Sequence, residues 1–287
     1  MGLNESLRAL GLEPRKGEIQ ILAQSLPYGH LNIEIFCNSK PREMLKTQKP
    51  KVKLYWQEHL KTHPRDFNGK LLSVKMIKKM HGNVHIFTRP CHFAEFKWSR
   101  QFCQGKILDI KSPEPLDLEY PLPLSVGPIV QTVPDRKHPN GCIVVSIRGN
   151  TAIENGQAGF IPSGYFSPIE DCKMKMAFPS QAALREMREE MSGIDSWSKA
   201  PKWSAIIQST IGSCQPLITG IMEIPFTAKE VTAICNQNLE AELQKIFCVP
   251  ADIESLKRFV AKNNLCSHDV GKITCLLEEI LEGNKRY

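Results

Sequence analysis

The chain has 287 residues, 41% of them hydrophobic, and a formal net charge of +7. That length allows one large domain or two small ones, and the hydrophobic fraction excludes a largely disordered chain. Its ten cysteines form no C-x-x-C pair, and the sequence contains no run of eighteen apolar residues. These features argue against a zinc site, a disulfide framework and a membrane span, and we expect a reduced, cytoplasmic setting.

Positive charge is concentrated in residues 40–80, which contain twelve Lys or Arg and three Asp or Glu. Such a surface suits nucleic acid, an acidic membrane or a phosphorylated substrate, and it is equally typical of a solvated face. Because these lysines are mixed with apolar residues, the solvated face is the preferred interpretation. Nucleic-acid binding is the alternative.

The first 125 residues predict an N-terminal accessory α+β region. Its expected elements are a strand over 31–37, a helix over 52–63 and a hairpin with strands 71–77 and 84–88 around His81-Gly82-Asn83. The aromatic group at 92–98 suits base stacking, but core packing is the more frequent fate of Phe and Trp. Four prolines in residues 112–123 predict a linker, so we place the domain boundary near residue 125.

The remaining residues, 126–287, predict an α/β domain with a mixed sheet between helices. Strands are expected over 128–133, 142–147, 204–210, 216–226 and 243–249, and helices over 180–193, 227–236, 251–263 and 268–282. Thr227 and Glu230 have the spacing of a capping box.

The helix predicted over 180–193 has an unusual charge pattern. Ser180 is its expected cap and Gly193 its expected left-handed end. Ala183, Met187 and Met191 form an apolar stripe, whereas three glutamates, Glu186, Glu189 and Glu190, crowd one edge of the helix. Like charges at this spacing cost about 0.2–0.5 kcal/mol per pair. Either pairing with neighbouring arginines or a hard divalent cation, which prefers oxygen ligands, would offset that cost.

The segment 164–194 resembles the Nudix box, G-x5-E-x7-R-E-U-x-E-E-x-G-U, where U is apolar. Gly164 and Glu170 fit the first two positions, residues 185–190 fit R-E-U-x-E-E, and Gly193 with Ile194 fits the end. Fourteen residues separate Glu170 from Arg185 where the pattern has seven, and two residues separate Glu190 from Gly193 where it has one. The resemblance implies a Nudix α/β/α sandwich for residues 126–287.

The resemblance also implies roles for individual residues. The metal ligands would be Glu186, Glu189, Glu190 and the backbone carbonyl of Ser163, with Mg²⁺ or Mn²⁺ as the cofactor. Arg185 would orient the box by pairing with Glu170, or with Asp171 if the longer loop prevents that pair. A further carboxylate, often the general base, would come from Glu240 or Glu242, or from Glu223, which lies inside a predicted strand.

The implied activity is divalent-metal-dependent hydrolysis of the pyrophosphate bond in a nucleoside diphosphate linked to another group, such as a nucleotide sugar or ADP-ribose. One alternative is a catalytically weak Nudix module that binds a nucleotide or RNA as a sensor or scaffold. Another alternative is an RNA-cap hydrolase, for which the basic residues 40–80 would be suited.

Overall fold

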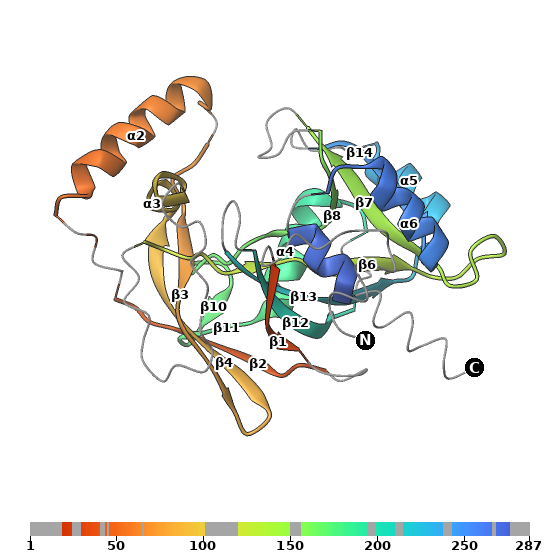
Figure 1. The fold of residues 1–287 in the computed structure, drawn as a ribbon, viewed down its shortest axis with the longest axis horizontal. Helices are drawn as coiled ribbons and strands as arrows, with labels where there is room; N and C mark the ends of the chain where they lie inside the picture. The colour runs from red at the N-terminus through yellow and green to blue at the C-terminus, as the bar shows by residue number, and fades with distance from the viewer. Residues whose placement is uncertain are drawn as a thin grey trace.

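Residues 19–24, 30–40, 44, 46–64, 66–100, 120–149, 156–194, 199–209, 215–237, 243–265 and 268–275 are described by the computed structural model. This part of the chain contains two sheets with helices packed around them (Figure 1). No helix in the described ranges is both long enough and apolar enough to cross a membrane.

The larger sheet is mixed, as predicted. Its strands are β1 (Ile19–Gln24), β5 (Ser125–Val126), β6 (Ile129–Thr132), β7 (Cys142–Arg148), β8 (Ala158–Phe160), β9 (Gly164–Tyr165), β12 (Lys202–Ser209), β13 (Pro216–Ile224) and β14 (Leu243–Pro250). The main order is β1-β12-β13-β6-β7-β14; off this path, β5 pairs with β13, β9 pairs with β5, and β8 pairs with β7. Strand β13 runs parallel to β5 and β6, and the other pairs are antiparallel.

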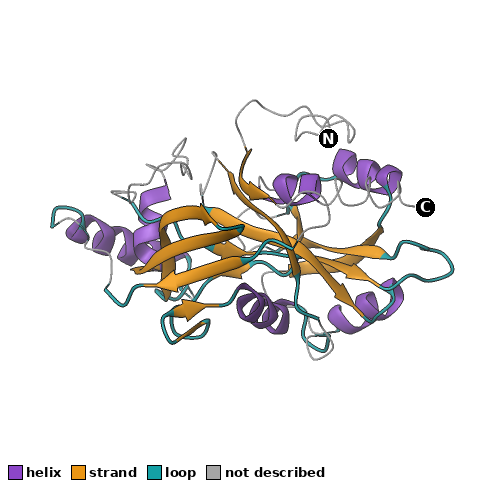
Figure 2. Cartoon of the chain, turned by 90° about the horizontal axis from the view of Figure 1, so that it is seen from below, coloured by secondary structure: helices purple, strands orange, loops and turns teal. Residues whose placement is uncertain are grey.

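Helices cover both faces of this sheet, which confirms the predicted α/β/α arrangement (Figure 2). The helices are α4 (Pro179–Glu190), α5 (Ala228–Cys235), α6 (Ile253–Lys262) and a helical segment at 268–275. Successive residues of β7 point to opposite faces, as the pleat of a strand requires. Val144 packs in the core that contains α4 and α5, whereas its neighbours Ile143 and Val145 pack with α6 and Ile273.

The second sheet contains β2 (Ile33–Cys37), β3 (Lys70–Met80), β4 (Asn83–His92), β10 (Cys172–Lys173) and β11 (Met176–Ala177). Its order is β10-β11-β2-β4-β3. The predicted hairpin is present and longer than expected. His81 and Gly82 both have positive φ, 49° and 83°, as a two-residue turn between antiparallel strands requires. Two further helices, α2 (Lys49–Thr62) and α3 (Phe93–Ser99), flank this sheet (Figure 1).

The hairpin β10–β11 was not predicted from the sequence. It lies in the loop between Glu170 and Arg185, which is longer than the Nudix-box pattern has it, and its strand β11 pairs with β2. Its turn residues Met174 and Lys175 have positive φ, 47° and 68°, without the glycine or asparagine that makes such turns recognisable. The extra length therefore adds two strands to the N-terminal sheet.

In both sheets, strands from before residue 125 pair with strands from after it. Besides β11 with β2, strand β1 pairs with β12 in the larger sheet. Backbone hydrogen bonds from Leu124 to Leu72 and from Phe166 to Leu124 connect the two sheets directly. The linker predicted at 112–123 lies outside the described residues up to position 119. Division into independent domains at residue 125 stays a prediction.

Candidate active site

Helix α4 carries the charged positions of the Nudix-like segment. It begins at Pro179, whose fixed φ suits the first turn, and its cap is Phe178, which makes no side-chain hydrogen bond. Ser180 was therefore wrongly predicted as the cap, because Pro179 starts the helix one residue earlier. The stripe Ala183, Met187 and Met191 is fully buried, and Gly193 has a φ of 93° just beyond the helix. Burial of this stripe fixes which edge of α4 the glutamates occupy.

Glu186 lies directly against the backbone of Gly164. A Cβ atom added at Gly164 would collide with the Glu186 carboxyl group, so a larger residue at this point of β9 would displace that carboxyl group. The Glu186 side chain is 10% exposed. Gly164 and Glu186 are separated by twenty-one residues in the sequence, yet this contact brings them into one site. Strand β9 must lie close to α4 for the Glu186 carboxylate to fit between them.

Arg185 organises the acidic groups through a buried ion pair with Asp171. Its Nε donates to Asp171 Oδ1 at 3.2 Å and its Nη2 donates to Oδ2 at 3.0 Å, a two-pronged contact. Nη2 also donates to the Tyr165 carbonyl at 2.7 Å, and Nη1 donates to Glu186 Oε1 at 2.7 Å and to Glu189 at 3.3 Å. Although burial works against its charge, these partners raise the pKa of Arg185.

The choice of Asp171 over Glu170 follows from the shape of the loop. Asp171 is fully buried and also accepts a hydrogen bond from the Ser167 N–H at 2.7 Å. Glu170 is 58% exposed, and its carboxylate lies 3.8 Å from Arg185 Nε. Of the two partners considered from the sequence, Asp171 is the one that the fold provides. Glu170 is the peripheral one.

Glu190 lies at the inner end of the acidic edge. Its Oε2 accepts a hydrogen bond from the Ser163 N–H at 3.2 Å, so the two residues expected to share a metal are in contact. Close by, Lys272 is 1% exposed; its Nζ donates to the Phe160 carbonyl at 3.0 Å and pairs with Asp269 at 3.1 Å. Arg148 and Lys272 both act electrostatically on Glu190. Neither was identified from the sequence, where they are single basic residues in otherwise ordinary elements.

The environment makes two of the glutamates hard to ionise together. Burial, opposed by Arg185, raises the pKa of Glu186 to about 7. Burial together with the neighbouring Glu186 raises the pKa of Glu190 to about 8. Clustered carboxylates with raised pKa values are typical of functional sites, because burial and like-charge neighbours are arranged there to match the pKa of each group to its task.

These residues fit a divalent cation by the chemistry of their donors. Glu186, Glu189, Glu190 and the Ser163 carbonyl are hard oxygen ligands of the kind that Mg²⁺ and Mn²⁺ take. Within the described ranges, no three acidic, histidine or cysteine side chains already converge on one point. The side chain of Glu189 is 51% exposed, and both of its carboxylate oxygens accept hydrogen bonds from Arg185 Nη1, at 3.3 and 3.4 Å.

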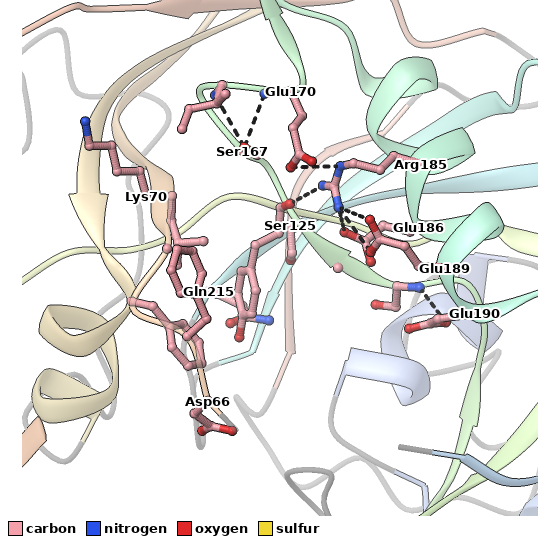
Figure 3. Close-up of a pocket in the computed structure, with 18 of the residues that line it drawn as sticks. Asp66, Lys70, Ser125, Ser167, Glu170, Arg185, Glu186, Glu189, Glu190 and Gln215 are labelled. Atoms are coloured by element: carbon pink, nitrogen blue, oxygen red, sulfur yellow. Dashed lines mark hydrogen bonds and ion pairs between the residues drawn. The ribbon is translucent and has the colours of Figure 1, made fainter. Parts of the chain in front are cut away.

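A cleft of about 720 Å³ opens in front of the acidic groups. Figure 3 shows Arg185, Glu186 and Glu189 on one side and Asp66 and Lys70 on the other. Phe67, Phe93 and Lys97 line the cleft as well, so part of its wall comes from residues 66–97 of the N-terminal region. The sequence did not indicate this juxtaposition, because it depends on how the two sheets are joined.

Of the three candidates for a further catalytic carboxylate, Glu223 lies within the described residues. Glu223 lies on β13, is 54% exposed and pairs with Lys202 at 3.5 Å; it does not line the cleft. Glu240 and Glu242 lie outside the described residues. Gln215 and Ser125 line the cleft and were not considered from the sequence.

Comparison with known proteins finds similarity to solved structures alone. No protein-family profile and no curated protein matches the sequence. Among solved structures, a MutT protein from Methanosarcina mazei Go1 is 15% identical, covers 59% of this chain and 99% of its own, and has a TM-score of 0.36. The Nudix hydrolase RenU from M. smegmatis is 13% identical over 56% and 86% of the two chains, with a TM-score of 0.33. A Nudix hydrolase from Alicyclobacillus acidocaldarius is 12% identical over 54% and 91%, with a TM-score of 0.36.

Two of these structures bear the name of the family that residues 164–194 resemble.

Proposed function

We propose that this protein is a divalent-metal-dependent hydrolase of the pyrophosphate bond in a nucleoside diphosphate linked to another group, acting in the cytoplasm. The observation that carries the proposal is the seating of the Glu186 carboxylate against Gly164, with Arg185 anchored on the buried Asp171. The arrangement holds a cluster of acidic groups at the mouth of a cleft large enough for a nucleotide.

The charge pattern supports hydrolysis of an anionic substrate only with a cation. Once ionised, Glu186, Glu189 and Glu190 would repel a diphosphate placed beside them, and Arg185 is already engaged by Asp171. A bound Mg²⁺ or Mn²⁺ would neutralise the phosphate oxygens and lower the pKa of a bound water molecule. Glu186, Glu189, Glu190 and the Ser163 carbonyl are the groups that would hold it.

The chain's own residues divide the remaining work. Arg185 bonds to the Tyr165 carbonyl and to Asp171, and thereby fixes the position of the Glu186 carboxylate. The Ser163 N–H orients Glu190 from the other side. Arg185 is thus a positioning residue, and Glu240 or Glu242 stays the proposed source of a general base.

The test is product formation on a small panel in the presence of Mg²⁺ or Mn²⁺. The panel contains UDP-glucose, ADP-ribose, NADH, a dinucleoside polyphosphate, dGTP and capped RNA, each assayed with the wild type and with Glu189→Gln. Metal-dependent release of a mononucleotide that the variant loses would support the proposal and name the substrate class. Turnover that persists in the variant would overturn the assignment of the site.

The second candidate is a Nudix module that binds a nucleotide or RNA without cleaving it. It is favoured by the absence of three converging ligand side chains in the described ranges and by the Arg185 contacts to both Glu186 and Glu189. Ligand binding at saturating Mg²⁺ with no product from any compound of the panel would support this candidate. Metal-dependent product formation would exclude it.

A further inference from the structure

Phe67 is an exposed aromatic side chain in the wall of the cleft opposite the glutamates. It is 83% exposed, more than any other aromatic residue among the large hydrophobic side chains exposed in the described ranges. The labelled residues Asp66 and Lys70 bracket it in sequence and mark this wall in Figure 3. A phenylalanine this exposed contributes almost nothing to the stability of the fold through burial.

The backbone that carries Phe67 is held on both sides. Asp66 pairs with His59 Nε2 at 2.7 Å, and Asn68 Oδ1 accepts a hydrogen bond from the Ala94 N–H at 2.8 Å. The Gly69 carbonyl accepts from the Phe93 N–H at 2.9 Å, and the Gly69 N–H donates to the Phe67 carbonyl at 2.9 Å. The loop is therefore fixed to α2 and α3 while the ring that it presents stays in solvent.

The ring rests over a glycine. A Cβ atom at Gly69 would lie 3.3 Å from two ring atoms of Phe67, closer than ordinary van der Waals contact. The Cδ1–Cε1 part of the ring thus lies near Gly69, and the 83% exposure leaves most of the ring open to the cleft. Nearby, Phe93 also lines the cleft, with Lys97 Nζ 5.3 Å from the centre of its ring. Aromatic surface and positive charge share this wall.

We propose that Phe67 is the stacking platform for the nucleobase of the substrate. This inference rests on the proposed function, because it places the base at the Phe67 wall and the diphosphate at the glutamates on the opposite side of the same cleft. A flat ring held on a braced loop binds a base at little cost in conformational entropy, since the platform is already ordered. Stacking is also tolerant of base identity, since every base has an aromatic face.

Residues other than Phe67 would contact the leaving group. With the base on the N-terminal wall, the group attached to the distal phosphate would lie toward Ser125 and Gln215, which line the cleft beside the larger sheet. The N-terminal region would then select nucleotides over other diphosphates, and the larger sheet would hold the cleavage chemistry.

The experiment measures binding of ligands that contain no bond to cleave. Calorimetric titrations with AMP, UMP and ribose 5-phosphate in Mg²⁺ compare the wild type with Phe67→Ala, Phe67→Tyr and Leu54→Ala. Leu54 is the matched control, because it is 68% exposed on α2 and does not line the cleft. Melting temperatures of all variants confirm that folding is unchanged, as the exposure of both positions leads us to expect.

The expected result is a loss of roughly tenfold or more in AMP and UMP affinity in Phe67→Ala, within the range that base stacking produces. Phe67→Tyr and Leu54→Ala should bind the mononucleotides like the wild type, and ribose 5-phosphate should bind weakly and equally to all four proteins. Unchanged AMP and UMP affinity in Phe67→Ala, no measurable binding of either mononucleotide, or ribose 5-phosphate binding as tight as AMP would each overturn the inference.

Failure of the proposed function looks different in the same proteins. Glu189→Gln should lose turnover, whereas Phe67→Ala should raise KM for the nucleotide substrate and leave kcat nearly unchanged. Absence of turnover with normal, Phe67-dependent AMP binding would reject hydrolysis and keep the base platform. Turnover with Phe67-independent KM would keep hydrolysis and reject the platform.

Discussion

Replacing Asp171 and Glu170 one at a time tests which acid anchors Arg185. The two residues are adjacent in sequence, yet Asp171 is fully buried with two bonds from Arg185, and Glu170 is 58% exposed at 3.8 Å. Removing one partner of a buried ion pair costs about 3–5 kcal/mol, because the other charge is left without compensation. An exposed pair contributes less than about 1 kcal/mol.

We therefore expect Asp171→Ala to lower the free energy of unfolding by about 3 kcal/mol and Glu170→Ala to lower it by less than about 0.5 kcal/mol. The figure for Asp171 is at the lower end because Arg185 keeps its contacts to Tyr165, Glu186 and Glu189. Urea denaturation followed by circular dichroism measures both values, with the slope m compared between variants to confirm that the same transition is observed.

Two further variants separate the charge of Asp171 from its hydrogen bonding and test its coupling to Arg185. Asp171→Asn keeps an oxygen for the Ser167 N–H but removes the charge, so it should lie between the wild type and Asp171→Ala. Combining Asp171→Ala with Arg185→Ala should cost less than the sum of the single changes, because the double variant leaves neither charge of this pair behind. Equal stabilities of Asp171→Ala and Glu170→Ala, or additive costs in the double variant, would refute the account.

Three other predictions follow from the site and its surroundings. Glu189→Gln should reduce metal-dependent turnover by at least 100-fold in a steady-state assay and leave the melting temperature within about 2 °C, because this side chain is half exposed and removing one surface charge has little effect on stability. Gly164→Ala should displace the Glu186 carboxylate, and calorimetry should find weaker Mn²⁺ binding, with a small loss of stability because the clash is with the end of a flexible side chain. Burial lowers the pKa of His268 to about 4, so its contribution to the free energy of unfolding should fall by about 1 kcal/mol between pH 7 and pH 5.5 and disappear in His268→Gln.

The effect of His268 on stability is isolated by comparing the wild type with the His268→Gln variant. Above pH 6.5 this histidine is neutral in both states; below that value the unfolded chain takes up a proton that the folded chain refuses, so stability falls. The raised pKa values of Glu186 and Glu190 act in the opposite direction, since their stability is complete below about pH 4.5 and is lost as pH rises through 7 to 8. Subtracting the free energy of unfolding of His268→Gln from that of the wild type at each pH removes the contribution of the glutamates, because both proteins contain them. A difference that stays constant between pH 5.5 and 7 would contradict the prediction.

Matched controls separate local from general effects in the other two cases. Glu254→Gln, on α6 and paired with Lys257 at 3.0 Å, should alter neither turnover nor Mn²⁺ binding. Gly82→Ala lies at a hairpin turn with open space around it, so it should cost stability through its positive φ without affecting the metal. Loss of Mn²⁺ affinity in either control, or normal affinity in Gly164→Ala, would count against the site.

The local elements of the site could be predicted from the sequence alone. The apolar stripe Ala183, Met187 and Met191 repeats every fourth residue because one face of a helix is buried, and β7 is apolar at most positions because both of its faces are buried. The capping box of Thr227 and Glu230 is also confirmed, with both of its hydrogen bonds present. The charged edge formed by Glu186, Glu189 and Glu190 follows directly from the position of the buried stripe.

Only the tertiary structure decided which of these groups meet. Asp171 rather than Glu170 pairs with Arg185 because the hairpin β10–β11 pairs with β2 and turns Asp171 inward. Phe67 enters the cleft because the chain near Leu124 joins the two sheets through backbone hydrogen bonds. The pairing of β11 with β2 joins residues about 140 apart in the chain, and that of β1 with β12 joins residues about 190 apart. No local spacing encodes such pairings, because which edges meet is set by the packing of whole sheets rather than by bonds between near neighbours.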